Sequence, residues 1–298
     1  MCRIAGWRCF GNVRPTFKEL SHMLLRMEPQ GRDATGFGTT NLDGSFKVVK
    51  APVGANEFVK TDEWRDANPH LHVWGMLHTR QATQGDKSKA VNNHPVVCVK
   101  HTVKSMAIHN GIVVDKYVAL PKAPEVDSFA FPYAASKVFS LDPHAAWGDA
   151  VDEITANIGG SAAIALVVEG RDQILLAADS APLVYMVDEG KDILWFASTD
   201  TILQGVMPSY RGFYAKPAVT GSLSHDYMVV GPSGFEGAGD FTLKGPYQYN
   251  SAYYTDEWWK GMPDRKATEV PRPPLETLPI SKKIPPKNVN KVAGGGVK

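Results

Sequence analysis

The sequence predicts an α+β fold in which antiparallel β-sheet is covered by a few helices. Short apolar runs of β type are separated by turn signals, and a few longer segments repeat their apolar residues at helical spacing. Strands that pair with their neighbours along the chain favour antiparallel layers over a doubly wound parallel sheet. The 298 residues are 43% hydrophobic and 21% charged, which indicates a globular chain with a sizeable core.

Three helices are expected. The first begins at a capping box, because Thr16 is followed three residues later by Glu19, and its apolar residues then recur at helical spacing. A second helix is expected to begin near residue 127. A third begins near residue 145, carries apolar residues on one face through Ile158, and is expected to end at Gly159–Gly160.

Six strands are expected from β-type runs, at residues 46–49, 73–77, 162–168, 174–178, 183–187 and 193–197. Turn signals lie between several of them, at Asp43–Gly44, Glu169–Gly170 and Glu189–Gly190. These signals predict hairpins, and hairpins join antiparallel strands.

Residues 1–230 are expected to form the folded domain, and residues 231–298 an arm and a tail. The segment 247–259 is too aromatic for a free linker, so we expect it to pack on its own domain, with a partner-docking patch as the alternative. The Pro-rich segment 271–286 and the Lys- and Gly-rich residues after it have little to bury. This tail is expected to be extended or disordered.

Charge and cysteine usage exclude several classes of protein. The chain has 32 Lys plus Arg against 31 Asp plus Glu, so we expect it to bind neither nucleic acid nor a membrane surface. Three cysteines without CxxC spacing argue against a disulfide framework and a structural zinc site. The first residues lack the apolar stretch of a secretory signal, and the run 162–168 is too short to span a bilayer. We therefore expect a cytoplasmic protein.

Cys2 is the first candidate for chemistry. Removal of Met1 would place a thiol and a free α-amine on the same residue. An α-amino group titrates near ~7.7 to 8.0 and a thiol near ~8.5, so the amine can accept the thiol proton without an added histidine. The plainer interpretation is an ordinary cysteine.

Four other positions offer groups that could complete a site. Arg80 lies in a polar block, expected as a loop after the strand 73–77, and a guanidinium can bind a carboxylate through two hydrogen bonds. Asn110–Gly111, expected at a strand end, offers an amide and an N–H to an oxyanion. Asp127 could hold an ammonium, and His94 precedes an apolar run. Taken singly, these could be a surface ion pair, a hairpin turn, an N-cap and a buried hydrogen-bonded histidine.

Six short motifs occur in one order between residues 2 and 205. They are Met-Cys at the start, Gly-Arg-Asp-Ala-Thr-Gly at 31–36, His-Thr-Arg-x-Ala-Thr-x-Gly at 78–85, Asn-x-His-Pro at 92–95, His-Asn-Gly at 109–111 and Asp-Ser at 127–128. In this order they resemble the glutaminase domain of class II glutamine amidotransferases, which are N-terminal nucleophile hydrolases. The resemblance implies a four-layer αββα sandwich of two antiparallel sheets.

The resemblance also implies a catalytic centre. Cys2 would attack the side-chain amide of L-glutamine while its own α-amine carries the proton, and Asn110 and Gly111 would form the oxyanion hole. Ammonia would be released, and the glutamyl thioester would be hydrolysed to glutamate. No cofactor and no metal ion are implied.

The same resemblance assigns the substrate contacts. Arg80, with Thr83 beside it, would bind the α-carboxylate of glutamine, and Asp127 would accept the α-ammonium. Opposite charges at the two ends of the amino-acid group would fix where the amide carbon lies relative to the thiol. His94 is either a substrate contact or a structural residue beneath the site.

The substrate and the fate of the ammonia stay open. Most members have Gly directly after the catalytic cysteine, whereas this chain has Arg3, and the Cys-Arg pair resembles the compact stand-alone branch. Gln81 and Gln84 stand where aromatic and histidine residues are common in sugar-aminating relatives. No segment after residue 205 is long or patterned enough for a synthetase site that uses ammonia, and no GxxxxGK[ST] motif of an ATP-dependent ligase occurs, so we expect a separate ammonia-acceptor protein. The alternatives are a stand-alone hydrolase of another γ-glutamyl amide and a catalytically silent binding or regulatory domain.

A zinc site is the remaining alternative. His70 and His72 alternate before a predicted strand, His78 follows it, and Asp66 is a possible fourth ligand. The strand from 73 to 77 should carry His78 away from the other two histidines, so the pattern favours metal only weakly.

Overall fold

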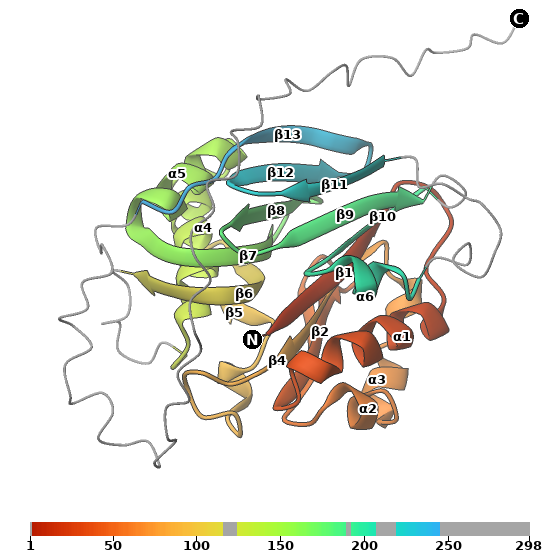
Figure 1. Cartoon of the computed structure of the whole chain (residues 1–298). Coiled ribbons are helices and arrows are strands. Elements are labelled where there is room, and N and C mark those ends of the chain that lie inside the picture. The colour runs from red at the N-terminus through yellow and green to blue at the C-terminus, as the bar shows by residue number, and fades with distance from the viewer. Residues whose placement is uncertain (1, 116–123, 189–191, 207–218, 245–298) are drawn as a thin grey trace, which may run out of the picture. The chain divides into compact units, whose positions relative to one another are not determined.

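Two antiparallel sheets lie at the centre of the computed structural model, which describes residues 2–115, 124–188, 192–206 and 219–244 (Figure 1). Sheet A has the strand order β11-β9-β10-β1-β4-β2-β3. Its strands are β1 Arg3–Cys9, β2 Ala34–Thr40, β3 Phe46–Ala51, β4 Trp74–Arg80, β9 Leu183–Asp188, β10 Ile193–Ala197 and β11 Val219–Leu223. The N-terminal strand β1 is therefore the middle strand of this sheet.

Sheet B has the order β13-β12-β8-β7-β6-β5. Its strands are β5 Val96–Cys98, β6 Ser105–Asp115, β7 Ile158–Val168, β8 Ile174–Asp179, β12 Asp226–Gly231 and β13 Gly234–Asp240. The longest pairing joins β6 to β7 over eleven residue pairs.

Helices cover the outer face of each sheet. Those packed against sheet A are α1 Phe17–Met27, α2 Ala55–Phe58, α3 Asp62–Asp66 and α6 Asp200–Leu203, and those against sheet B are α4 Ala130–Leu141 and α5 Trp147–Asn157. Short 3₁₀ turns complete the described elements at η1 Glu28–Gln30, η2 Pro69–Leu71, η3 Ala90–Asn92 and η4 Asp127–Phe129. No helix among the described residues has the length and apolar character needed to cross a membrane.

Three apolar layers hold the helices and sheets together. Side chains of β1 alternate between two of these layers. Ala5 and Trp7 pack with α1, whereas Ile4 lies in the layer between the two sheets, where Ile108 of β6 also lies. A third cluster joins sheet B to α4 and α5. The arrangement is the four-layer αββα sandwich that the motifs implied.

The predicted helices are confirmed, with one end misplaced. The Thr16–Glu19 capping box is formed in full and begins α1. The second helix begins with the turn η4 and continues as α4. The third ends at Asn157 instead of at Gly159–Gly160, because Ile158 and both glycines belong to β7 and pair with β6.

The six predicted strands are confirmed as β3, β4, β7, β8, β9 and β10. Hairpins join β2 to β3, β7 to β8 and β9 to β10, although Glu189 and Gly190 lie outside the described residues. The polar block after residue 77 is not a loop from its start, because β4 continues through Arg80. The domain division at residue 230 stays a prediction, and the 247–259 and 271–286 segments lie outside the described residues.

Candidate active site

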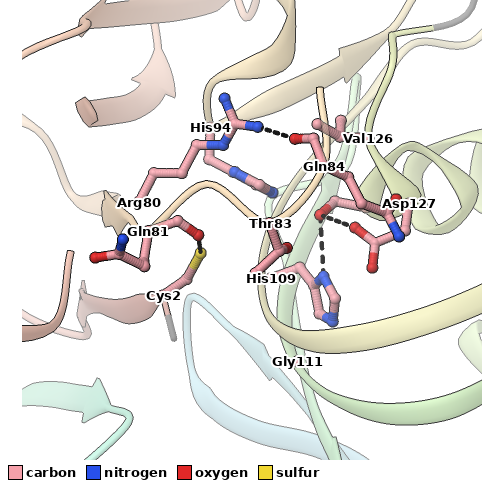
Figure 2. Close-up of a pocket in the computed structure, with 11 residues that line it drawn as sticks. Cys2, Arg80, Gln81, Thr83, Gln84, His94, His109, Gly111, Val126 and Asp127 are labelled. Atoms are coloured by element: carbon pink, nitrogen blue, oxygen red, sulfur yellow. Dashed lines mark hydrogen bonds between the residues drawn. The ribbon is translucent and has the colours of Figure 1, made fainter. Parts of the chain in front are cut away.

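A pocket lies at the end of β4, beside the entry into β1 (Figure 2). It has an empty volume of about 290 Å³, part of which is open to solvent. The residues that line it come from five separate segments: Cys2, Arg80, Gln81, Thr83, Gln84, His94, His109, Gly111, Val126, Asp127 and Ser128. Cys2, Arg80, Thr83, His94, Gly111 and Asp127 of the predicted site are therefore brought together.

Cys2 is placed by the middle strand of sheet A. Arg3 of β1 pairs with Thr79 of β4, so the preceding Cys2 lies beside the end of β4. The thiol is half-buried and its Sγ donates to the carbonyl oxygen of Gln81 at 3.6 Å. Burial raises the pKa of Cys2, which the nearby Arg80 opposes without overcoming. The resting side chain is therefore a thiol, and its use as a nucleophile requires a base.

Arg80 is a buried cation held by neutral oxygen atoms. Only 2% of the residue is exposed, and its Nη1 donates to Asn93 Oδ1 at 2.6 Å. Its Nη2 donates to the carbonyl oxygens of Gln84 and Gly85. Among the described residues Arg80 forms no ion pair, so the predicted alternative of a surface ion pair is wrong. A guanidinium that lines a pocket and has no ion-pair partner is suited to bind an anion.

The loop after Arg80 is anchored by the Gly-Arg-Asp-Ala-Thr-Gly motif. Asp33 Oδ2 accepts the Ala82 N–H at 2.8 Å, and its Oδ1 lies 2.7 Å from Lys87 Nζ. These contacts lower the pKa of Asp33 in spite of its partial burial. The anchored loop presents Thr83 to the pocket as an exposed side chain.

Three histidines form the buried wall behind this loop. The rings of His78 and His94 stack with centroids 4.0 Å apart, and His78 Nε2 donates to the carbonyl oxygen of His109 at 3.1 Å. Burial lowers the pKa of His78 to about 3, that of His94 well below its ordinary value, and that of His109 in the same direction. All three rings are therefore neutral near pH 7.

His94 differs from its expected alternative as a hydrogen-bonded core histidine. It is buried, but neither ring nitrogen has a hydrogen-bond partner in the structure. A buried imidazole without partners carries an unfavourable free energy, and a polar ligand in the pocket would relieve it. This observation is compatible with substrate contact as well as with a structural role.

Asn110 and Gly111 lie in the middle of β6, so the predictions of a strand end and of a hairpin turn are wrong. Gly111 has φ of +148°, and a Cβ there would lie 2.0 Å from the Ser161 carbonyl oxygen. Only glycine therefore fits this position. Asn110 is buried on the face that packs against sheet A, and its Oδ1 has no partner. Asn110 does not line the pocket itself.

Asp127 lines the pocket opposite the Arg80 loop and is not an N-cap. The cap residue of η4 is Val126, while Asp127 Oδ2 accepts the Val113 N–H at 3.0 Å. Its Oδ1 accepts from Ser128 Oγ at 3.3 Å, and Ser128 Oγ in turn lies 3.0 Å from His109 Nδ1 (Figure 2). The Ser128 hydroxyl therefore links Asp127 to His109. The chain of bonds orients the carboxylate.

The zinc alternative fails on the placement of His78. This residue stacks on His94 inside the fold, whereas His72 contacts the Ala67 carbonyl oxygen. Within the described ranges no three His, Cys, Asp or Glu side chains gather as a metal site would need.

Known proteins of similar sequence and fold carry this architecture. The glutamine–fructose-6-phosphate aminotransferase of Bartonella henselae is 28% identical over 210 residues, which cover 68% of this chain and 32% of that protein. The enzyme of that name from Thermus thermophilus is 29% identical over 202 residues, covering 65% and 31%. The chain is therefore similar in sequence to glutamine–fructose-6-phosphate aminotransferases. Its match spans about a third of the length of these curated relatives.

Solved structures confirm the fold. The glutamine phosphoribosylpyrophosphate amidotransferase of B. subtilis matches with a TM-score of 0.60 at 14% identity, over 81% of this chain and 50% of that one. An allosteric regulatory enzyme of purine biosynthesis matches with a TM-score of 0.58 at 14% identity, over 82% and 49%. No family model matches the chain.

Sequence reasoning missed several neighbours of the pocket. Ser128 was noted only as part of a motif, and the contacts of Lys50, Asn93 and Glu125 were not anticipated. These side chains meet the site across 13 to 43 residues of sequence. No local pattern signals such pairings, although Asn93 does lie within the quoted Asn-Asn-His-Pro segment.

Proposed function

We propose that this chain hydrolyses the side-chain amide of L-glutamine, with Cys2 as the nucleophile, and releases ammonia for an acceptor. The observation that carries the proposal is that one pocket is lined by a thiol, a glycine backbone, a cation and an anion, at Cys2, Gly111, Arg80 and Asp127. The relatives that match in sequence are named for the use of glutamine, which supports this choice of substrate.

The charges of the pocket suit an α-amino acid. Arg80 has no anionic partner among the described residues, so its guanidinium is proposed to bind the α-carboxylate of glutamine. Asp127 faces the same pocket and is proposed to accept the α-ammonium. Thr83, exposed on the loop between them, adds a hydroxyl. Two opposite charges orient the substrate, so its side chain extends toward Cys2.

The proton of the thiol needs an acceptor. His94 and His109 line the pocket, but burial holds the pKa of each below its ordinary value, so they are poor bases. The α-amine of Cys2 is the proposed base, which requires removal of Met1. The Sγ–C bond then forms, the C–N bond breaks, and the ammonia takes the thiol proton. Water hydrolyses the thioester and gives glutamate.

The developing oxyanion is proposed to be stabilised at the middle of β6. The backbone N–H of Gly111, which lines the pocket, and the side-chain amide of Asn110 are the candidate donors. The ammonia acceptor is proposed to be a separate protein.

An intact-mass experiment tests the nucleophile. The untagged protein is measured before and after incubation with 6-diazo-5-oxo-norleucine, an electrophilic glutamine analogue. We expect loss of Met1 and one covalent adduct that excess glutamine prevents. The matched control is Cys98→Ala, which removes a buried cysteine outside the pocket and should keep the adduct, whereas Cys2→Ala should lose it.

Ammonia release from glutamine is then measured on the same samples. An adduct on the Cys2→Ala protein would refute the proposed nucleophile, and turnover by protein that retains Met1 would refute the role of the α-amine. Processed protein that forms no adduct and hydrolyses a different γ-glutamyl amide would move the assignment to that substrate.

A further inference from the structure

Two adjacent asparagines lie behind the pocket and are almost completely buried. Asn92 is 0% exposed and Asn93 is 1% exposed. Buried amides are found where their hydrogen bonds are satisfied, and here the two side chains bond to different segments of the site. They therefore connect parts of the pocket that no local sequence pattern relates.

Asn93 holds the cation. Its Oδ1 accepts from Arg80 Nη1 at 2.6 Å, and its Nδ2 donates to the Lys87 carbonyl oxygen at 2.7 Å. Its backbone carbonyl is itself fixed, because Lys50 Nζ donates to the carbonyl oxygens of Asn93 and Pro95 at 2.7 and 3.0 Å. The guanidinium of Arg80 is therefore hydrogen-bonded to Asn93, whose backbone is held by Lys50 of the edge strand β3.

Asn92 holds the segment that carries the anion. Its Nδ2 donates to Glu125 Oε2 at 2.9 Å, and its Oδ1 accepts the Glu125 N–H at 2.8 Å. Glu125 stands two residues before Asp127. Gly85 lies directly against this segment, because a Cβ there would be 2.6 Å from the Glu125 carbonyl oxygen. The loop after Arg80 and the segment before Asp127 are therefore in contact.

We propose that the Asn92–Asn93 pair fixes the spacing between Arg80 and Asp127 and so selects substrates that carry a carboxylate and an ammonium on one carbon. The inference rests on the proposed function, since it assigns these charges to the two ends of glutamine. Asn92 and Asn93 touch no substrate in this scheme. They are positioning residues: Asn93 acts through Arg80, and Asn92 acts through the segment that carries Asp127.

The two halves of the pair can be separated by truncated ligands. 4-Carbamoylbutanoate is glutamine without its α-amine, so it engages Arg80 but not Asp127. 4-Aminobutanamide is glutamine without its α-carboxylate, so it engages Asp127 but not Arg80. Each compound is measured as a competitive inhibitor of ammonia release from glutamine by the full-length protein.

The expected result is a crossed pattern. Asn93→Ala should raise both the KM for glutamine and the inhibition constant of 4-carbamoylbutanoate by about tenfold or more, because the hydrogen bond between Asn93 and the charged Arg80 is lost. The inhibition constant of 4-aminobutanamide should stay unchanged. Asn92→Ala should raise the KM and the inhibition constant of 4-aminobutanamide instead. The value of kcat should move less than the KM in both variants.

Further variants guard against a loss of folding. Asn93→Asp keeps an oxygen for Arg80 but adds a negative charge that competes for the guanidinium, so it should weaken 4-carbamoylbutanoate and leave 4-aminobutanamide unweakened. Glu125→Ala removes an exposed partner of Asn92 and should repeat the Asn92→Ala pattern more weakly. The matched control is Asn157→Ala, which deletes an asparagine bonded to the Glu153 carbonyl oxygen at the end of α5 and should leave all three constants unchanged.

The alternative outcomes are distinct. If both alanine variants weaken all three ligands equally, or weaken none, the selective role of the pair is refuted while the proposed function stands. If the wild-type protein releases no ammonia from glutamine, the proposed function fails and this inference fails with it.

Discussion

Mild acid is expected to destabilise the protein through its buried histidines. Burial lowers the pKa of His78 to about 3 and that of His94 well below its ordinary value, whereas an unfolded histidine titrates near ~6.5. Below that pH the unfolded chain binds more protons than the folded chain. The free energy of unfolding must therefore fall as the pH falls from about 6.5 toward the depressed pKa values.

The size of the effect follows from this linkage. At about pH 5.5 an unfolded imidazole gains about 1.4 kcal/mol from protonation that a folded His78 cannot gain. His94 adds a similar amount, and His109 changes in the same direction. The loss from His78 and His94 together, about 3 kcal/mol, is a large part of the roughly 5–15 kcal/mol stability of an ordinary domain. Carboxylates titrate mainly below about pH 4.5, so this window isolates the imidazoles.

Chemical denaturation at about pH 7.5 and about pH 5.5 measures the loss. The variant His78→Gln keeps a donor for the His109 carbonyl oxygen and should reduce the pH dependence by about 1.4 kcal/mol. The matched control His144→Gln alters an exposed histidine of a turn and should reproduce the wild-type dependence. A wild-type protein whose unfolding free energy changes by less than about 1 kcal/mol across the window would refute the reasoning.

Three further perturbations test the pocket and its support. Arg80→Lys should raise the KM for glutamine by about tenfold or more, because an ammonium cannot reproduce the planar fork, and an unchanged KM would exclude Arg80 from binding. Gly111→Ala should lose more than about 2 kcal/mol of stability and its activity, because its Cβ would clash with the Ser161 carbonyl oxygen, whereas Gly237→Ala has room and should resemble wild type in thermal melts. Burial lowers the pKa of Lys50 to about 8, so between about pH 8 and 10.5 the folded state binds fewer protons than the unfolded state and this lysine's contribution to stability rises with pH. The unfolding free energy of wild type should therefore rise by up to about 3 kcal/mol relative to that of Lys50→Met over this pH range. A difference between the two unfolding free energies that does not change with pH would contradict the lowered pKa of Lys50.

Local patterns predicted much of the fold because they report local physics. The Thr16–Glu19 capping box and the apolar runs of β3, β7 and β10 depend on neighbours a few residues away, and all of them formed. Strand β1 was not predicted, because Arg3 and Arg8 interrupt its apolar pattern. Both arginines are buried, and Arg8 is paired with Asp172, a partner 164 residues away.

The errors at the site have a common cause. The prediction ended β4 where polar residues begin, and it placed Asn110–Gly111 at a strand end with a hairpin turn as the alternative, since buried strands are usually apolar. His78, Thr79 and Arg80 are nevertheless buried strand residues, because their polar groups find acceptors inside the fold, at the carbonyl oxygens of His109 and Met27 and at Asn93 Oδ1. The residue types of the site were therefore predictable from motifs, whereas the Asn92–Glu125 and Lys50–Asn93 contacts required the fold.

The place of β1 in sheet A ties chemical competence to completed folding. This strand is hydrogen-bonded to β4 on one side and, through pairs such as Ala5 with Ala197, to β10 on the other. During translation β1 is made first, whereas β10, its second neighbour in the sheet, is made almost two hundred residues later. A nascent chain therefore holds its thiol on an unfinished sheet, and the proposed release of ammonia has to wait until distant parts of the polypeptide have met. Turnover of glutamine by this protein would accordingly serve as a sensitive reporter of complete assembly.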